Sequence, residues 1–116
     1  MKQIAIIFSV LFSITKINAQ KSITGIWNAR EDNTKIELTE DNGVFSGKIL
    51  SSDNPKAKIG KQLIKDVKPS NGKYKGKLYA AKKGKWYDAV LKESGDQLDI
   101  TIKVGWMSKT LIWKKE

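Results

Sequence analysis

The chain alternates between apolar and polar residues over short stretches, as strands with one buried face do. Within residues 97–104, leucine, isoleucine and valine occupy every second position, and polar residues stand between them. After the first nineteen residues, no stretch sustains the period of an amphipathic helix. The pattern therefore predicts an all-β chain of eight short strands. These are Ile23–Ala29, Thr34–Glu40, Val44–Leu50, Lys61–Val67, Lys73–Tyr79, Trp86–Lys92, Gln97–Val104 and Thr110–Lys115.

Turn-forming residues separate most of these strands. Asp41-Asn42-Gly43, Ser70-Asn71-Gly72 and Ser94-Gly95-Asp96 contain glycine or asparagine, which tolerate the positive φ of tight hairpins. Lys82-Lys83-Gly84 predicts a fourth turn, and Ser51–Gly60 is the one long connection. Eight short strands joined mostly by hairpins favour a small antiparallel up-and-down barrel, which would also remove exposed strand edges.

The first nineteen residues have the features of a secretory leader. Met1–Gln3 carries a positive charge, Ile4–Ile14 is largely apolar, and Ala19 is a small residue ahead of a cleavage point. The apolar stretch is shorter than the roughly 20 residues that a membrane span needs, although an N-terminal anchor is the alternative interpretation. We expect residues 1–19 to be a signal peptide and residues 20–116 to be a single domain. The mature protein would be periplasmic or secreted, with no membrane span.

The composition restricts the chemistry that the chain can perform. Histidine and cysteine are both absent, which removes the commonest general base, the thiolate nucleophile and the usual zinc ligands. The acidic runs at residues 31–33 and 40–43 lack the alternating ligand spacing of a calcium loop. We therefore expect a protein that is not an enzyme and that uses neither a metal nor another cofactor.

Two tryptophans are predicted to pack inside the barrel. Trp27 and Trp113 lie on the first and last strands, which become neighbours when a barrel closes. Their simplest role is to fill one end of the interior. The residues to which we assign a structural role are Gly25, Trp27, Gly47, Gly76 and Trp113.

Small residues on inward faces leave space in the interior. Gly47, Gly76 and Ala89 alternate with larger apolar residues, and the space beside them would be filled by the tryptophans or by a ligand. In the second case, tyrosine side chains would offer an apolar ring and a hydroxyl to a small apolar or amphipathic molecule. The predicted ligand contacts are Phe45, Tyr74, Leu78, Tyr87, Leu91 and Trp106.

Lysine dominates the charge of the chain. The formal net charge is +10, and Arg30 is the only arginine. Lysine is a hydrated point charge without the bidentate geometry of arginine, so specific nucleic-acid recognition is not expected. Lys73, Lys75 and Lys77 line one outward strand face, which a solvated surface explains most simply.

The alternative function is a surface module that binds polyanions such as envelope glycans or nucleic acid. Its structural form would be a compact oligonucleotide-binding or SH3-like barrel, with fewer and longer strands. The oligomeric state is not indicated by the sequence. The residues of this alternative are Lys73–Lys77, Lys82, Lys83, Lys85 and Trp86.

Several short motifs resemble one family along nearly all of the mature chain. The sequence is similar to the DUF2147 family, small exported bacterial proteins without an assigned function, and more distantly to lipocalins and the avidin group. The resemblance implies a lipocalin-like barrel and export, and it implies no known activity. The matching residues are Gly25-Ile26-Trp27, Gly47-Lys48-Ile49, Gly76-Lys77-Leu78-Tyr79, Gly84-Lys85-Trp86-Tyr87, Leu91, Leu98, Lys109-Thr110 and Trp113-Lys114.

The chain departs from the family pattern at a few positions. Ala80-Ala81 stand where an Asp-Pro is usual, and Thr101-Ile102 where the family has an Arg-Gly pair. Lys109 and Lys114 replace arginines, and the connection from Trp106 to Lys109 is short. Any polar cluster that those arginines form in relatives is therefore weaker here or missing.

Overall fold

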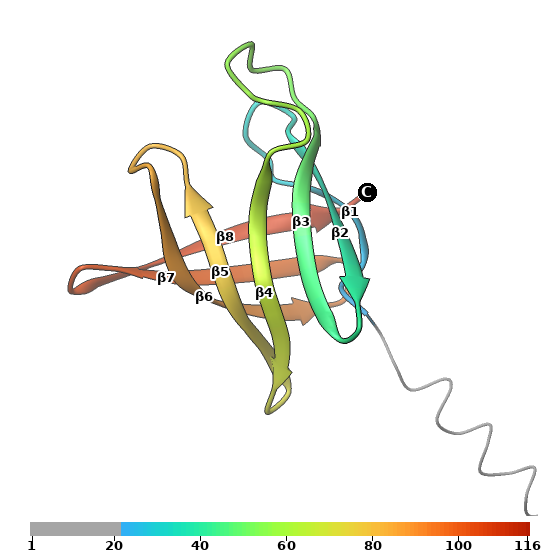
Figure 1. Cartoon of the computed structure of the whole chain (residues 1–116), viewed down its shortest axis with the longest axis vertical. Helices are drawn as coiled ribbons and strands as arrows, with labels where there is room; N and C mark the ends of the chain where they lie inside the picture. The colour runs from blue at the N-terminus through green and yellow to red at the C-terminus, as the bar shows by residue number, and fades with distance from the viewer. Residues whose placement is uncertain (1–21) are drawn as a thin grey trace, which may run out of the picture.

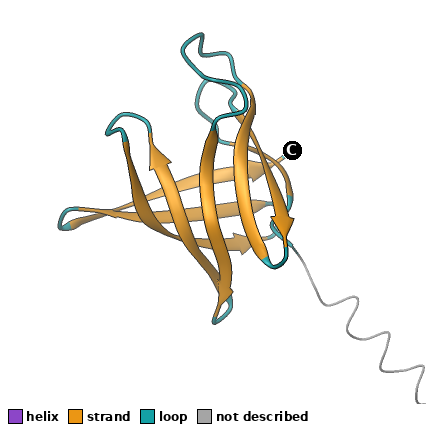
Figure 2. Cartoon of the chain, in the orientation of Figure 1, coloured by secondary structure: helices purple, strands orange, loops and turns teal. Residues whose placement is uncertain are grey.

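The computed structural model describes residues 22–116, and the predicted signal peptide lies outside this part of the chain. The eight predicted strands form one closed antiparallel barrel, in which each strand pairs with its neighbours in sequence and β8 pairs with β1 (Figure 1). Residues 22–116 contain no helix, so none is available to cross a membrane (Figure 2). The strands are β1 (Gly25–Asn28), β2 (Lys35–Asp41), β3 (Val44–Ser51), β4 (Gln62–Ser70), β5 (Lys73–Ala80), β6 (Lys85–Ser94), β7 (Gln97–Val104) and β8 (Met107–Lys115).

The structure confirms the lipocalin-like barrel and differs from the alternative with fewer, longer strands. The predicted bounds of β7 agree with the structure, whereas β8 begins at Met107 and not at Thr110. The earlier start follows from the tight turn at Gly105, which has a φ of 68°. Asn42 and Asn71, each followed by a glycine, also have the positive φ that two-residue hairpin turns require.

Alternating apolar side chains fill the interior. Trp27 is fully buried, and its indole Nε1 donates a hydrogen bond of 2.9 Å to the carbonyl oxygen of Ile23. The ammonium of Lys115 lies 4.8 Å from the centroid of the Trp27 ring. The core contains no buried polar or charged residue within the described chain. The buried residues are Ile23, Trp27, Ile36, Leu38, Phe45, Ile49, Ile64, Val67, Leu78, Ala89, Leu91, Leu98, Ile100, Ile102 and Trp113.

Two inward glycines make room for their neighbours. A Cβ atom on Gly47 would lie 2.5 Å from Cδ2 of Leu38. A Cβ on Gly76 would lie 2.8 Å from Cα of Val67 and 2.9 Å from the carbonyl oxygen of Lys65. The space beside both glycines is therefore occupied by residues of adjacent strands.

The barrel closes at a short seam between β1 and β8. Only two residue pairs join these strands, Trp27 with Lys115 and Asn28 with Lys114. Beyond them, the backbone N–H of Glu116 donates to the carbonyl oxygen of Ile26 at 3.0 Å. The seam thus has fewer paired residues than any other strand interface of the described barrel.

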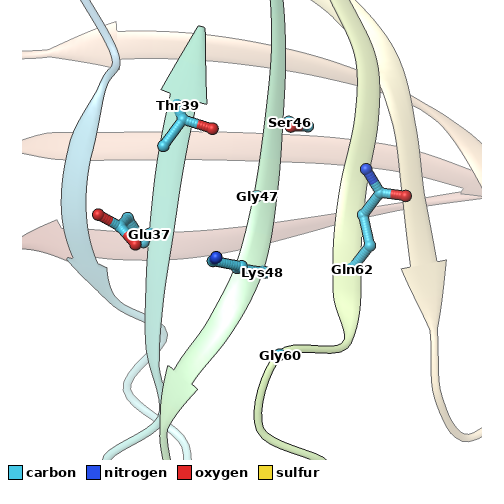
Figure 3. Close-up of a pocket in the computed structure, with 7 residues that line it drawn as sticks. All are labelled: Glu37, Thr39, Ser46, Gly47, Lys48, Gly60 and Gln62. Atoms are coloured by element: carbon cyan, nitrogen blue, oxygen red, sulfur yellow. The ribbon is translucent and has the colours of Figure 1, made fainter.

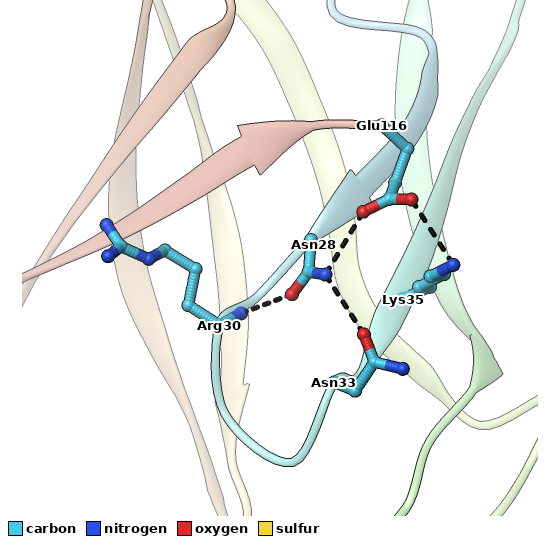
Figure 4. Close-up of polar contacts among 5 residues, drawn as sticks. All are labelled: Asn28, Arg30, Asn33, Lys35 and Glu116. Carbon is cyan, nitrogen blue, oxygen red and sulfur yellow. Dashed lines mark hydrogen bonds and ion pairs between the residues drawn. The ribbon is translucent and has the colours of Figure 1, made fainter.

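Side chains reinforce this seam around the carboxylate of Glu116. The amide Nδ2 of Asn28 donates to Oε2 of Glu116 at 3.0 Å, and Nζ of Lys35 lies 3.2 Å from Oε1 (Figure 4). The same Asn28 side chain accepts a 2.7 Å hydrogen bond from the backbone N–H of Arg30 and donates to Oδ1 of Asn33 at 3.2 Å. The network ties the C-terminal strand to the β1–β2 turn.

The seam network should make the free energy of unfolding depend on pH. The hydrogen bond from Asn28, and then the one from Lys35, lower the pKa of Glu116 below its ordinary value. A carboxylate whose pKa is lower in the folded state than in the unfolded state stabilises the fold at pH values above the unfolded pKa, which is about 4.3 for glutamate. This stabilisation is lost as the pH falls through the folded-state pKa. We expect Glu116→Gln to unfold at a lower denaturant concentration than the wild type at pH 7.

The denaturation midpoints of the wild type and Glu116→Gln should converge below pH 4. The difference between them at pH 7 should be small, because the carboxylate is exposed to solvent. Urea melts at neutral and acidic pH measure it. Glu31→Gln, at a carboxylate with no hydrogen bond or ion pair among the described residues, is the matched control. An E116Q deficit that stays constant across this pH range would contradict the role assigned to Glu116.

Candidate functional site

Five of the six predicted ligand contacts share the inner wall formed by β3, β5 and β6. Phe45 and Tyr74 pack edge to face, with ring centroids 5.3 Å apart. Leu78 pairs with Tyr87 across β5 and β6, and Tyr74 pairs with Leu91. Trp106 is separate from these, because it lies in the β7–β8 turn with 93% of its surface exposed.

The interior wall offers limited access to a ligand. Phe45, Leu78 and Leu91 are buried in the core, while Tyr74 and Tyr87 are half-buried at its margin. Burial, followed by the charges of Glu93 and Glu40, raises the pKa of the Tyr74 hydroxyl, which stays neutral. Small-ligand binding at these residues remains a prediction.

Two open hollows lie on the outer surface where β3 and β4 change register. The first, of about 290 Å³, combines the hydroxyls of Thr39 and Ser46 with the side chains of Glu37, Lys48 and Gln62 (Figure 3). The second, of about 480 Å³, shares Ser46 and Gln62 with the first. None of the six predicted contacts lines either hollow.

Positive charge is concentrated on one part of the barrel. Residues 61–92, which contain β4, β5 and β6, carry ten lysines against two carboxylates, Asp66 and Asp88. All other described residues together carry nine lysines and arginines against ten carboxylates. The net positive charge of the described chain therefore belongs to three consecutive strands and their connections.

Lysines on β4 and β5 stand directly opposite one another. Lys65 pairs with Lys77, and Lys68 pairs with Lys75. Like charges in such positions destabilise a sheet unless they are offset. We call the outer surface that carries these residues the lysine face, defined by Lys61, Lys65, Lys68, Lys73, Lys75 and Lys77.

Only part of this repulsion is offset locally. Lys77 donates a 2.7 Å hydrogen bond to Oδ1 of Asp88, which raises the pKa of the lysine and lowers that of the aspartate. Among the described residues, Lys68 and Lys75 form no ion pair. The lysine face thus retains charge that an anionic partner could neutralise.

Two aromatic rings border the lysine face and position two of its ammonium groups. Tyr79 and Trp86 pair across β5 and β6, with centroids 5.4 Å apart. Nζ of Lys61 lies 4.2 Å from the Tyr79 centroid, and Nζ of Lys65 lies 4.3 Å from that of Trp86. Cation–π attraction of this kind restricts where each ammonium can lie.

Sequence reasoning identified part of this surface. It selected the Lys73–Lys77 stripe and Trp86, but it missed Tyr79 and three further lysines, Lys61, Lys65 and Lys68. Tyr79 continues the alternation of the stripe, which could have placed it on the same face. Its contact with Trp86 depends on the β5–β6 register, which no single residue reveals.

The described residues contain no group of three or more histidine, cysteine, aspartate or glutamate side chains that could hold a metal ion. The chemical groups of the lysine face are its ammonium groups and the rings of Tyr79 and Trp86. Their arrangement suits electrostatic binding of an extended anion.

A family model described as an uncharacterized protein conserved in bacteria, DUF2147, matches residues 25–115. No curated protein matches the chain. The matched region includes all eight strands and the lysine face.

Proposed function

The chain belongs to the DUF2147 family, and from this premise we propose that it is an exported, non-enzymatic barrel that binds an anionic glycan of the cell envelope through the lysine face. The observation that supports the proposal is the segregation of charge. Ten lysines accompany only two carboxylates between residues 61 and 92, whereas the remaining described residues are nearly balanced.

The geometry of the strands presents this charge as a two-dimensional array. Residues two apart on a strand lie about 7 Å from each other, and neighbouring strands lie about 5 Å apart. Lys73, Lys75 and Lys77 therefore form a row on β5, beside Lys65 and Lys68 of β4. A linear polyanion laid on this surface would contact several ammonium groups and release the counterions that it carries.

A glycan fits this surface better than a nucleic acid. Lysine provides point charges, whereas bidentate recognition of phosphates and bases depends on arginine. The rings of Tyr79 and Trp86 each have an ammonium over one face, so that face is not free for base stacking. The predicted export would place the protein among envelope polymers.

Neutralising Lys68 and Lys75 should weaken glycan binding. We expect Lys68→Gln/Lys75→Gln to lower affinity for polygalacturonate by about tenfold or more at 0.1 M salt. Each lost contact also releases fewer counterions, so the slope of log affinity against log salt should become less steep, as it does by roughly 0.7 per contact for single-stranded nucleic acids. Fluorescence anisotropy with labelled polymer across a salt series measures both quantities. Lys56→Gln/Lys103→Gln makes the same change in charge outside the lysine face and is the control.

The outcomes distinguish the possible ligands. An equal loss in both double variants, or no binding at low salt, would refute the lysine face as a polyanion site. Tighter binding of single-stranded DNA than of polygalacturonate would refute the glycan as the ligand, while the lysine face would remain the binding surface. Interior binding of a neutral molecule, the second candidate, is supported by the half-buried Tyr74 and Tyr87 and would hardly respond to salt.

A further inference from the structure

One strand of the barrel has a partner on only one side for most of its length. β8 pairs with β7 from Met107 to Lys114, but it pairs with β1 only at Lys114 and Lys115. β1 ends at Asn28, and the chain then turns back towards β2. In the described chain, residues 107–113 therefore form a free strand edge, and the β7–β8 hairpin projects from the barrel (Figure 1).

The hydrogen bonds at the end of β8 establish which residues face the open side. The N–H of Lys115 donates to Asp96 on the β7 side, and the N–H of Glu116 donates to Ile26 on the β1 side. Because successive residues of a strand direct their backbone groups to opposite sides, even-numbered residues face away from β7. Ser108, Thr110 and Ile112 thus present N–H and C=O groups to the open side.

Exposed apolar side chains gather on the same hairpin. Trp106, Met107 and Ile112 are exposed by 93%, 55% and 40%, and they are three of the five large hydrophobic residues exposed in the described chain. An unpaired strand edge beside apolar side chains is a template for another strand.

We propose that this edge pairs with the same edge of a second copy of the chain, antiparallel about a two-fold axis at Thr110. The free run, residues 107–113, contains seven residues, and Thr110 is its middle one. Under this symmetry Thr110 faces Thr110 of the second copy, and Ser108 faces Ile112. The three edge-facing positions of each strand then form hydrogen-bonded pairs, each exchanging two backbone bonds.

Self-pairing is favoured by the charges near the edge. Lys109 is the only charged residue in the free run, and the two-fold at Thr110 places it opposite Leu111 and not opposite itself. Residues 93–116 carry four lysines and four carboxylates, so the two copies meet through neutral segments. An acidic peptide would find little complementary charge here, whereas the threonine pair at the axis is a favourable cross-strand contact.

The dimer does not depend on glycan binding, because the lysine face lies on β4–β6. Its interface leaves both lysine faces uncovered and joins two of them in one assembly. Linked sites of this kind bind a long polymer more tightly than either site alone.

Sedimentation velocity over a range of concentrations tests the proposal. A short edge interface is of the size typical of reversible association, so we expect the purified wild-type protein to shift from monomer to dimer as its concentration rises. Thr110→Pro should be monomeric throughout. Its barrel should persist, because the N–H that proline removes faces the open side and not β7.

A charge at the axis provides a second test. Thr110→Lys should also be monomeric, because it sets two lysines directly opposite each other. The control is Thr101→Lys, one strand from the edge. It adds the same charge and breaks the same 3.1 Å hydroxyl contact between Thr101 and Thr110, yet it should dimerise like the wild type.

Circular dichroism confirms that each variant is folded. A wild type that remains monomeric at every concentration would overturn the proposal. Lys109 would then be a charged residue that prevents the free edge from pairing with another strand. A folded Thr110→Pro variant that dimerises like the wild type would overturn it as well.

Discussion

Replacing Trp27 with alanine is expected to destabilise the barrel by about 3–5 kcal/mol. The side chain is fully buried, and its indole N–H is bonded to the carbonyl oxygen of Ile23. Alanine would leave a cavity, and the carbonyl oxygen of Ile23 would lose its hydrogen-bond donor. The ammonium of Lys115 would also lose its contact with the indole ring. The loss is a large share of the total stability of a small domain, which is roughly 5–15 kcal/mol.

Thermal unfolding followed by circular dichroism measures the effect. For a domain of this size, each kcal/mol shifts the midpoint by about 4–8 °C, so a decrease of more than about 12 °C is expected. Trp106→Ala makes the same chemical change at a side chain that is 93% exposed and should melt close to the wild type. A Trp27→Ala midpoint within a couple of degrees of the wild type would show that the ring does not hold the core together.

Adding one methyl group at Gly76 is expected to destabilise the barrel by about 1–3 kcal/mol. The new Cβ would approach Cα of Val67 and the carbonyl oxygen of Lys65, which are backbone atoms and cannot move independently of β4. Gly47→Ala is the matched comparison, because its nearest neighbour is the end of the Leu38 side chain, which can rotate. Gly76→Ala should therefore be the more costly of two otherwise identical changes.

Urea denaturation of both variants gives the comparison directly. Equal midpoints, or a lower midpoint for Gly47→Ala, would mean that β4 is not held rigidly against Gly76. A Gly76→Ala variant as stable as the wild type would mean that the space beside this glycine is not occupied as described.

Alternation and turn residues were sufficient to predict the barrel, because each strand has one buried face and most connections are tight hairpins. The predicted fourth strand, Lys61–Val67, ends two residues before Pro69, and proline is normally absent from the interior of a sheet. The strand nevertheless continues to Ser70, past a register irregularity between Lys65 and Lys68. Asp66, with a φ of 55°, lies within this irregularity.

This irregularity also explains why the candidate site was only partly predicted. The row of lysines on β5 follows from simple alternation, but the facing lysines of β4 do not. If side chains alternated regularly after Lys65, which faces outward, Lys68 would face the interior. The irregularity between these two residues instead places Lys68 on the outer face, opposite Lys75. Trp106 is predicted as a ligand contact together with the inner-wall residues, but a turn of two residues places it at the tip of a hairpin, away from that wall.

The short seam between β1 and β8 has a consequence for the order in which the chain folds. Seven of the eight strand interfaces join consecutive strands, and such local hairpins form within microseconds. The seam joins Trp27 to Lys115, so its formation requires closure of nearly the whole domain as one loop. We expect a curved, open meander to precede the barrel, and the rate of folding to be limited by the meeting of its first and last strands.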